Sequence, residues 1–157
     1  MKIIYNVDAI TEPLTGIGRY TLHLGQQLSQ MVNDDTLDID DIRFFSSNRW
    51  VENLSSAAKG NEWIGKLRQF VPAKFTALKY YHSMRSRHLS KLSTGMNNHV
   101  FHSPNFILMP FEGPSVATFH DLSFVHYRET QPNYRLKFLD KEIPKTLAQA
   151  QHIITPS

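Results

Sequence analysis

The sequence predicts an α/β domain built on a parallel sheet, with helices on both faces, and three observations support this prediction. Short runs of β-branched and aromatic residues recur along the 157 residues. Stretches with the three- and four-residue spacing of amphipathic helices separate these runs. Such alternation is typical of parallel sheets, because a helix usually provides the crossover between two parallel strands. The length fits one domain with a substantial hydrophobic core.

The first predicted strand covers residues 2–7, where the chain is rich in β-branched residues. The turn formed by residues 16–18 then opens a predicted helix, with Thr15 placed to cap it. The helix is expected to end near Asn33. Apolar residues at helical spacing predict its buried face. They are Ile17, Tyr20, Leu24, Leu28 and Met31.

The middle of the chain is less regular. Residues 39–46 predict a second strand, and the small polar residues of 46–61 predict a loop. Basic and aromatic residues alternate over 62–92, which we expect to be helical in one or two pieces broken near Pro72. Two brief strands should follow, at 99–102 and 115–119.

The last third of the sequence predicts an irregular segment up to Gln131. A helix should follow, which Pro132 is well placed to start. Pro144 falls within this helix, where we expect a kink. A further strand opens at His152, and the sequence stops directly after it. This arrangement suggests the N-terminal part of a longer protein.

Composition narrows the possible functions. The sequence has no cysteine, so disulfide and thiolate chemistry are excluded. It has no apolar run of about 18 residues that would cross a membrane, and its first apolar run is too short for a signal peptide. The formal net charge is +3, but residues 63–111 contain no acid. Such an acid-free block favours an anionic partner, namely a nucleic acid, a phosphorylated ligand or an anionic lipid surface.

This block has two main interpretations. It could be a solvated basic face, or it could bind an anionic lipid surface through cations flanked by aromatic anchors. Nucleic acid ranks third, because no common recognition motif is present. The candidate membrane-surface residues are Lys66, Arg68, Lys74, Lys79, Arg85 and Arg87.

The pair His120-Asp121 follows the predicted strand at 115–119. In open parallel sheets, ligands bind just beyond the carboxyl ends of the strands. An imidazole beside a carboxylate at this position predicts a catalytic site. The alternative is structural: Asp121 would cap the following turn and His120 would bond only to the backbone.

The turn Gly16-Ile17-Gly18 places free amides and a positive helix end where an anion could bind. The dinucleotide fingerprint is disfavoured, because its third glycine would fall at Thr21. A metal site is also disfavoured, because His99 and His102 lie three apart in a predicted strand and point to opposite faces. His102 could still face the same crevice as His120.

Four motifs occur in a characteristic order: the segment Gly16-Ile17-Gly18-Arg19-Tyr20, the stretch 118–124, Pro144 within a helix, and the segment 153–157. Together they resemble the N-terminal domain of family 4 glycosyltransferases with the GT-B fold. The resemblance is greatest to the bacterial mannosyltransferases of O-antigen and other surface polysaccharides. It covers nearly the whole chain and is weakest over about 47–98.

The resemblance implies a protein with two Rossmann-like domains that face each other across a cleft. Residues 1–157 would form the N-terminal, acceptor-side domain, and the nucleotide-sugar domain would be absent from this chain. Such enzymes retain anomeric configuration and need neither metal nor cofactor. The expected reaction is sugar transfer, with mannose from GDP-mannose, to a glycan or lipid-linked acceptor in lipopolysaccharide synthesis. The expected location is cytoplasmic, at the inner face of the plasma membrane.

The resemblance also implies roles for individual residues. His120 would face the transferring sugar, and Asp121 would orient that region. The loop of Gly16, Ile17 and Gly18 would lie beside the donor diphosphate, with Arg19 and Tyr20 bordering the cleft. Candidates for the acceptor side of the cleft are His102, Ser103 and Asn105.

Two other functions remain open from the sequence. One is a non-catalytic module that binds anions or a lipid surface, which the basic block supports. The other is a metal-dependent hydrolase built on His120 and Asp121, which has less support. As a transferase, the fragment alone should be inactive, because half a cleft cannot hold donor and acceptor in register.

Overall fold

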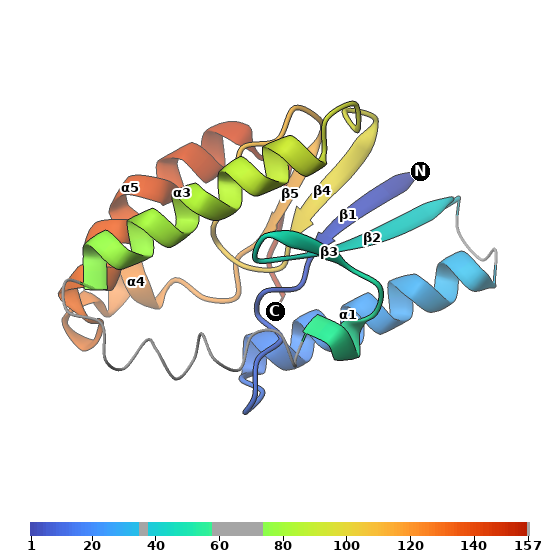
Figure 1. Cartoon of the computed structure of the whole chain (residues 1–157). Helices are drawn as coiled ribbons and strands as arrows, with labels where there is room; N and C mark the ends of the chain where they lie inside the picture. Colours follow the sequence, from blue (N-terminus) through green and yellow to red (C-terminus); the bar gives the residue numbers. More distant parts are fainter. Residues whose placement is uncertain (35–37, 58–73, 157) are drawn as a thin grey trace.

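The computed structural model describes residues 1–34, 38–57 and 74–156, and within them six strands form one sheet (Figure 1). The strands are β1 (Lys2–Asn6), β2 (Asp41–Ser46), β3 (Arg49–Val51), β4 (His99–Ser103), β5 (Ser115–Thr118) and β6 (His152–Ile154). Their order across the sheet is β3-β2-β1-β4-β5-β6. All neighbouring strands are parallel except β3, which runs antiparallel to β2.

Helices cover both faces of this sheet (Figure 1). Helix α1 (Gly16–Asn33) lies on one face, and α3 (Lys74–Leu92) and α5 (Asn133–Gln149) lie side by side on the other. The short helix α4 (Ser123–His126) and the 3-10 turn η1 (Arg128–Thr130) connect β5 to α5. The predicted α/β class, with a mainly parallel sheet and helices on both faces, is therefore confirmed.

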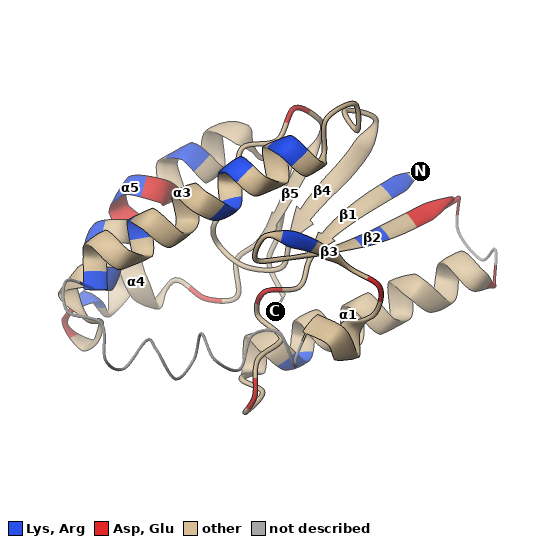
Figure 2. Ribbon diagram, in the orientation of Figure 1, with Lys and Arg blue, Asp and Glu red and all other residues tan. Residues whose placement is uncertain are grey.

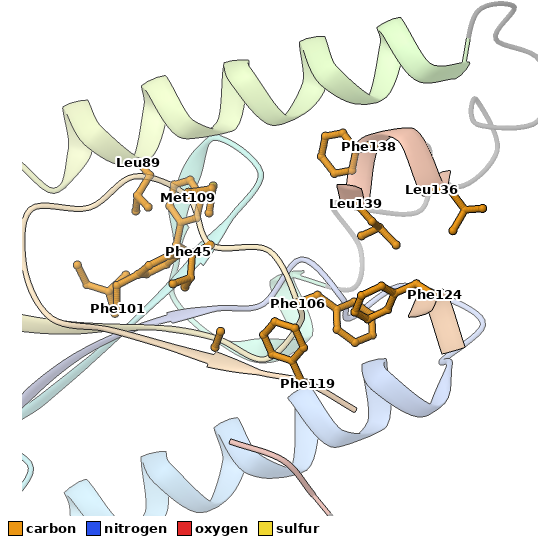
Figure 3. Close-up of a cluster of buried hydrophobic side chains, with 13 residues drawn as sticks. Phe45, Leu89, Phe101, Phe106, Met109, Phe119, Phe124, Leu136, Phe138 and Leu139 are labelled. Carbon is orange, nitrogen blue, oxygen red and sulfur yellow. The ribbon is translucent and has the colours of Figure 1, made fainter. Parts of the chain in front are cut away.

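The core has two parts because neighbouring strand residues point to opposite faces. Ile4, Phe45 and Phe101 pack with the layer of α3 and α5, whereas Ile3 and Tyr5 pack on the side of α1. Figure 3 shows the first part, in which aromatic side chains from strands, loops and helices pack together. Its labelled residues are Phe45, Leu89, Phe101, Phe106, Met109, Phe119, Phe124, Leu136, Phe138 and Leu139.

Helix α1 begins and ends where the sequence predicts, but its buried face differs from the predicted one. The fully buried residues are the small Gly18, Thr21 and Gly25, and the predicted apolar face is only half-buried. A Cβ on Gly25 would lie 3.2 Å from side-chain atoms of Leu54 and Tyr5. Small residues thus let the helix approach the sheet closely, and the apolar residues flank this contact line.

Two other predictions need correction, and a third falls partly on residues that the structure does not describe. Strand β3 lies in the predicted loop 46–61, where Trp50 packs its ring 5.8 Å from that of Phe45. The segment predicted to be irregular contains α4 and η1. Of the predicted helix 62–92, α3 confirms the part from Lys74 onward, while Pro72 lies outside the described residues.

The topology creates one favoured position for a ligand. The chain leaves β1 toward β2 on one side, and later returns to pair β4 with β1 on the other side. The connections at the carboxyl ends of β1 and β4 therefore diverge, and ligands of open parallel sheets bind at such a point. In the part of the chain that the structure describes, no helix has the length and apolarity needed to span a membrane.

Candidate functional site

The glycine-opened helix and the segment after β5 meet at the carboxyl edge of the sheet. The ring of Tyr20, in the second turn of α1, packs edge-on against the ring of His120, with centroids 4.8 Å apart and planes at 84°. These residues come from the two motifs that sequence analysis singled out. The fold therefore places both motifs beside the diverging ends of β1 and β4.

His120 is held by the backbone. Its Nε2 lies 3.0 Å from the carbonyl oxygen of Pro104, just after β4. Because a carbonyl oxygen only accepts hydrogen bonds, Nε2 carries the proton and donates it. In the neutral ring, Nδ1 then keeps its lone pair and can accept a hydrogen bond. His120 can thus act toward a ligand as an acceptor through one defined atom.

Asp121 points elsewhere. Its side chain is exposed, and its Oδ1 accepts a hydrogen bond of 2.8 Å from the amide of Ser123, the first residue of α4. This hydrogen bond holds the pKa of Asp121 below its ordinary value. Asp121 caps the turn, and His120 bonds to the backbone, as the structural alternative proposed. This local anchoring does not exclude a role for His120, because Nδ1 remains available.

The two glycines at the start of α1 have different surroundings. The Thr15 hydroxyl accepts a hydrogen bond of 3.1 Å from the amide of Gly18, which confirms the predicted cap. A Cβ on Gly18 would lie 2.7 Å from the carbonyl oxygen of Ala9, so the fold itself requires this glycine. A Cβ on Gly16 would have no neighbour within 4 Å.

The amides of Gly16 and Ile17 are available to a ligand. The first backbone hydrogen bond of the helix runs from Arg19 to the carbonyl of Thr15, at 2.9 Å, and the amides before it have no intrahelical acceptor. Together with the positive end of the helix, they favour an anion at this turn. The side chain of Arg19 is exposed beside them.

Asn6 joins the ends of β1 and β4 and was not among the residues predicted for the site. Asn6 is buried, and its Nδ2 donates to Ser103 Oγ at 3.5 Å while its Oδ1 accepts from the amide of Asp8 at 3.2 Å. The Ser103 hydroxyl in turn donates to the carbonyl of Ile107 at 3.0 Å. A polar residue at the end of an otherwise apolar strand is the sequence feature that would have identified Asn6.

The other two acceptor-side candidates differ in position. His102 is in the interior, with Nε2 3.0 Å from Thr118 Oγ1 and its ring 5.3 Å from that of Tyr5. Burial lowers the pKa of His102 to about 4. Only 7% of His102 is exposed, whereas His120 is half-buried. Asn105 is half-buried and accepts a hydrogen bond from the amide of Phe106, which shapes the loop after β4.

Arg85 belongs to this edge and not to the exposed basic face. It forms an ion pair with Asp8, and only 14% and 13% of the two side chains are exposed. The Arg85 guanidinium lies 5.3 Å from the centroid of the Tyr81 ring. Asp8 also accepts a hydrogen bond from the amide of Ser47, after β2. Arg85 therefore anchors α3 to the loops that follow β1 and β2.

The remaining candidate surface cations are exposed where they are described. Lys74, Lys79 and Arg87 lie on α3, and Lys74 lies 5.7 Å from the centroid of the Tyr134 ring of α5. Lys66 and Arg68 lie outside the described residues. Figure 2 shows that basic residues continue from α3 onto the neighbouring α5.

Within residues 1–34, 38–57 and 74–156, no set of three or more His, Asp or Glu side chains is arranged to hold a metal ion. His99, the partner of His102 in the disfavoured metal hypothesis, bonds through Nδ1 to Asn98 Oδ1 at 2.8 Å.

Comparison with known proteins finds a distant relative among curated glycosyltransferases. The O-antigen chain mannosyltransferase B of Escherichia coli is 29% identical over 163 residues, a match that covers 100% of this chain. The chain spans 41% of the length of that relative. No protein-family model and no solved structure matches the chain.

Proposed function

We propose that this chain is the acceptor-side domain of a retaining glycosyltransferase. The reaction would transfer mannose from GDP-mannose to a glycan or lipid-linked acceptor in surface polysaccharide synthesis. The observation that carries the proposal is the contact of Tyr20 with His120, which brings the helix start and the strand end to one edge. The distant relationship to an O-antigen mannosyltransferase supports the same reaction class.

The start of α1 would bind the diphosphate of the donor. The leaving diphosphate gains negative charge as the glycosidic bond breaks, and fixed donors close to it lower the barrier. The amides of Gly16 and Ile17 are such donors, and the open space beside Gly16 admits the phosphate oxygens. Arg19 would add a positive charge at the rim of the cleft.

His120 would contact the sugar that is transferred. Its Nδ1 would accept a hydrogen bond from a sugar hydroxyl, because the Pro104 carbonyl holds the proton on Nε2. Asp121 would act only indirectly, by fixing the turn at α4 that follows His120. Ser103 and Asn105 would line the acceptor side, where Asn6 holds the strand ends together.

The test uses the natural gene product, including whatever coding sequence follows residue 157. Transfer of labelled mannose from GDP-mannose to endogenous lipid-linked acceptor should be detectable, and His120→Ala should reduce kcat by about two orders of magnitude. The same substitution should leave the thermal midpoint nearly unchanged, because His120 is only half-buried.

His23→Ala is the matched control, because it removes an exposed imidazole from α1 outside the site. It should retain full activity. Wild-type turnover in His120→Ala would exclude the assigned role. Absence of transfer from any nucleotide-activated mannose would argue against the reaction itself.

A second function, binding to an anionic lipid surface, is favoured by the exposed cations of α3 and α5. Lys79, Arg87, Lys137 and Lys141 are exposed and have no acidic partner among the described residues. Such a face would hold the protein at the cytoplasmic side of the plasma membrane, near a lipid-linked acceptor. Lys74 would contribute to this face, and Arg85 is left out because it is paired with Asp8.

Vesicle binding distinguishes this function from a solvated basic face. Charge reversal of Lys79 and Arg87 to Glu should reduce binding to phosphatidylglycerol vesicles by about 30-fold or more at low salt, because each cation contributes about 1 kcal/mol. Reversal of Arg49, exposed on β3, is the control and should have a smaller effect. Equal binding of the two variants would contradict a specific lipid face. Vesicle binding without any transferase activity in the natural gene product would favour the non-catalytic module.

A further inference from the structure

A polar groove lies between the second half of α3 and the loop before β5. It consists of two adjoining hollows of about 440 Å³ and 160 Å³, and both are lined by Ser90 and Pro110. The larger one is also lined by Ser86, Arg87, Lys91 and Thr94. The smaller one is also lined by Ser93, Phe111 and Glu112.

This groove is separate from the candidate active site. The end of α3 leads into the start of β4, and residues 110–112 lead into the start of β5. The groove therefore lies toward the amino ends of these parallel strands, whereas His120 and the start of α1 lie at the carboxyl edge. The inference drawn from it does not depend on the proposed transferase activity.

Opposite charges are separated along the groove. Arg87 and Lys91 stand one helical turn apart in the larger hollow, and neither has an acidic partner among the described residues. Like charges at this spacing repel each other, and a bound anion would relieve the repulsion. Glu112 lines the smaller hollow, is exposed and has no basic partner in the described part of the chain.

The hydroxyl groups of the groove are mostly acceptors toward a ligand. Ser86 donates its proton to the carbonyl of His82 at 2.9 Å, and Ser93 donates to that of Leu89 at 2.7 Å. The Thr94 hydroxyl lies 3.0 Å from the carbonyl of Lys91 and is used in the same way. Each oxygen keeps lone pairs but has no proton left to donate. A ligand that carries N–H donors would satisfy these oxygens.

We propose that this groove binds a phosphoethanolamine group, that is, a phosphate joined through two carbons to a primary ammonium. The phosphate would lie between Arg87 and Lys91, and the ammonium would lie beside Glu112 and the Ser93 hydroxyl. This orientation matches the separation of charges, and it uses the acceptor oxygens for the ammonium N–H groups. Such a group occurs as a lipid headgroup and in soluble phosphodiesters.

The test compares four soluble probes by amide chemical-shift titration of the protein. Glycerophosphoethanolamine should bind more tightly than glycerol 3-phosphate, ethanolamine or glycerophosphocholine. Glycerol 3-phosphate lacks the ammonium, ethanolamine lacks the phosphate, and choline has no N–H donor for Glu112 and Ser93. The perturbed amides should be those of residues 86–94 and 110–112.

Substitutions separate the two ends of the site. Glu112→Gln should weaken glycerophosphoethanolamine about tenfold and remove its advantage over glycerol 3-phosphate. The double variant Arg87→Gln/Lys91→Gln should weaken both phosphate probes about tenfold or more. Arg49→Gln, which removes an exposed cation of β3 outside the groove, is the control and should bind as the wild type does.

Several outcomes would overturn the proposal. Equal affinity for glycerol 3-phosphate and glycerophosphoethanolamine would show only an anion site. An equal loss in Arg49→Gln would show non-specific charge attraction. No saturable binding of any probe would exclude a site. Sedimentation with phosphatidylethanolamine vesicles, compared with phosphatidylcholine vesicles, distinguishes the two sources of the phosphoethanolamine group. Preferential sedimentation with phosphatidylethanolamine vesicles indicates a lipid headgroup. Binding of the soluble probe alone indicates a small phosphodiester.

Discussion

At the candidate site, a single side chain can hold the backbone with one atom and leave another atom without a protein partner among the described residues. His120 bonds to the Pro104 carbonyl through Nε2 and keeps Nδ1 for a ligand. The sequence identified His120 because it follows a buried strand, but it could not show which atom bonds to the backbone. The adjacent Asp121 illustrates the limit, because only the position of α4 determines that its carboxylate caps a turn.

The first prediction concerns Gly16 and Gly18. Gly18→Ala should destabilise the protein by about 1–3 kcal/mol, because its Cβ would lie 2.7 Å from the Ala9 carbonyl oxygen. Gly16→Ala should leave stability within about 1 kcal/mol of the wild type, because its Cβ meets no protein atom within 4 Å. Urea unfolding of both variants measures the difference. In the natural gene product, Gly16→Ala should raise KM for the nucleotide-sugar donor.

The two variants act as controls for each other. Equal destabilisation would contradict the assigned difference in surroundings. A Gly16→Ala variant that is fully stable and has an unchanged donor KM would remove this turn from the proposed diphosphate site, without affecting the assignment of Gly18 to the fold.

At the scale of elements, hydrophobic periodicity predicted the helices better than it predicted their buried faces. Helix α1 was correctly placed, but its contact line runs through Gly18, Thr21 and Gly25. A periodicity count gives weight to large apolar residues and overlooks small ones that permit close approach. Strand β3 was missed because only three residues form it. Its stability comes from pairing with β2, and no local sequence pattern shows this pairing.

The second prediction concerns the anchor between α3 and the sheet. Asp8→Asn and Arg85→Met should each cost about 2–3 kcal/mol, because each leaves a mostly buried group without its ionic partner. The double variant should cost less than the sum, with a coupling energy of about 1 kcal/mol or more. Urea unfolding of the three variants measures this cycle.

The exposed pair of Arg43 and Asp41 provides the control, because 46% and 37% of these side chains are exposed. Removal of this pair should change stability by less than about 1 kcal/mol. If the Asp8–Arg85 cycle were additive within error, the ion pair would not be the anchor of α3.

At the scale of the whole molecule, the sequence predicted the α/β class, because strand and helix patterns alternate along the entire chain. The same alternation predicts a parallel sheet. Because ligands of parallel sheets bind at the carboxyl ends of the strands, the sequence also predicted a site at that edge. The sequence could not show that His102 is buried against Tyr5 and Thr118, since neighbouring strands provide both contacts. The two short helices after β5 also escaped prediction, because α4 and η1 are too short for a periodic pattern.

The third prediction is that stability falls as pH decreases from 6.5 to 4. Burial lowers the pKa of both His82 and His102 to about 4, so these rings are neutral in the folded protein at pH 5. In the unfolded chain they would take up protons below about 6.5, which favours unfolding. At pH 5 each ring should account for a loss of up to about 2 kcal/mol relative to pH 7.5.

Urea unfolding at pH 7.5 and 5.0 measures this loss. His102→Gln should reduce the pH dependence, because the amide can still bond to Thr118 but does not titrate. The same midpoint at both pH values in the wild type would contradict the buried, neutral state of the two rings.

The two margins of the sheet have different consequences for the behaviour of the protein in concentrated solution. The outer strand β3 is short and carries the exposed Arg49, which disfavours the addition of another strand. The opposite outer strand, β6, has exposed Ile153 and Ile154, with 44% and 38% of their surface accessible. The unpaired backbone N–H and C=O groups of an apolar outer strand can form hydrogen bonds with a strand of another molecule. Self-association of isolated residues 1–157 would therefore start at β6.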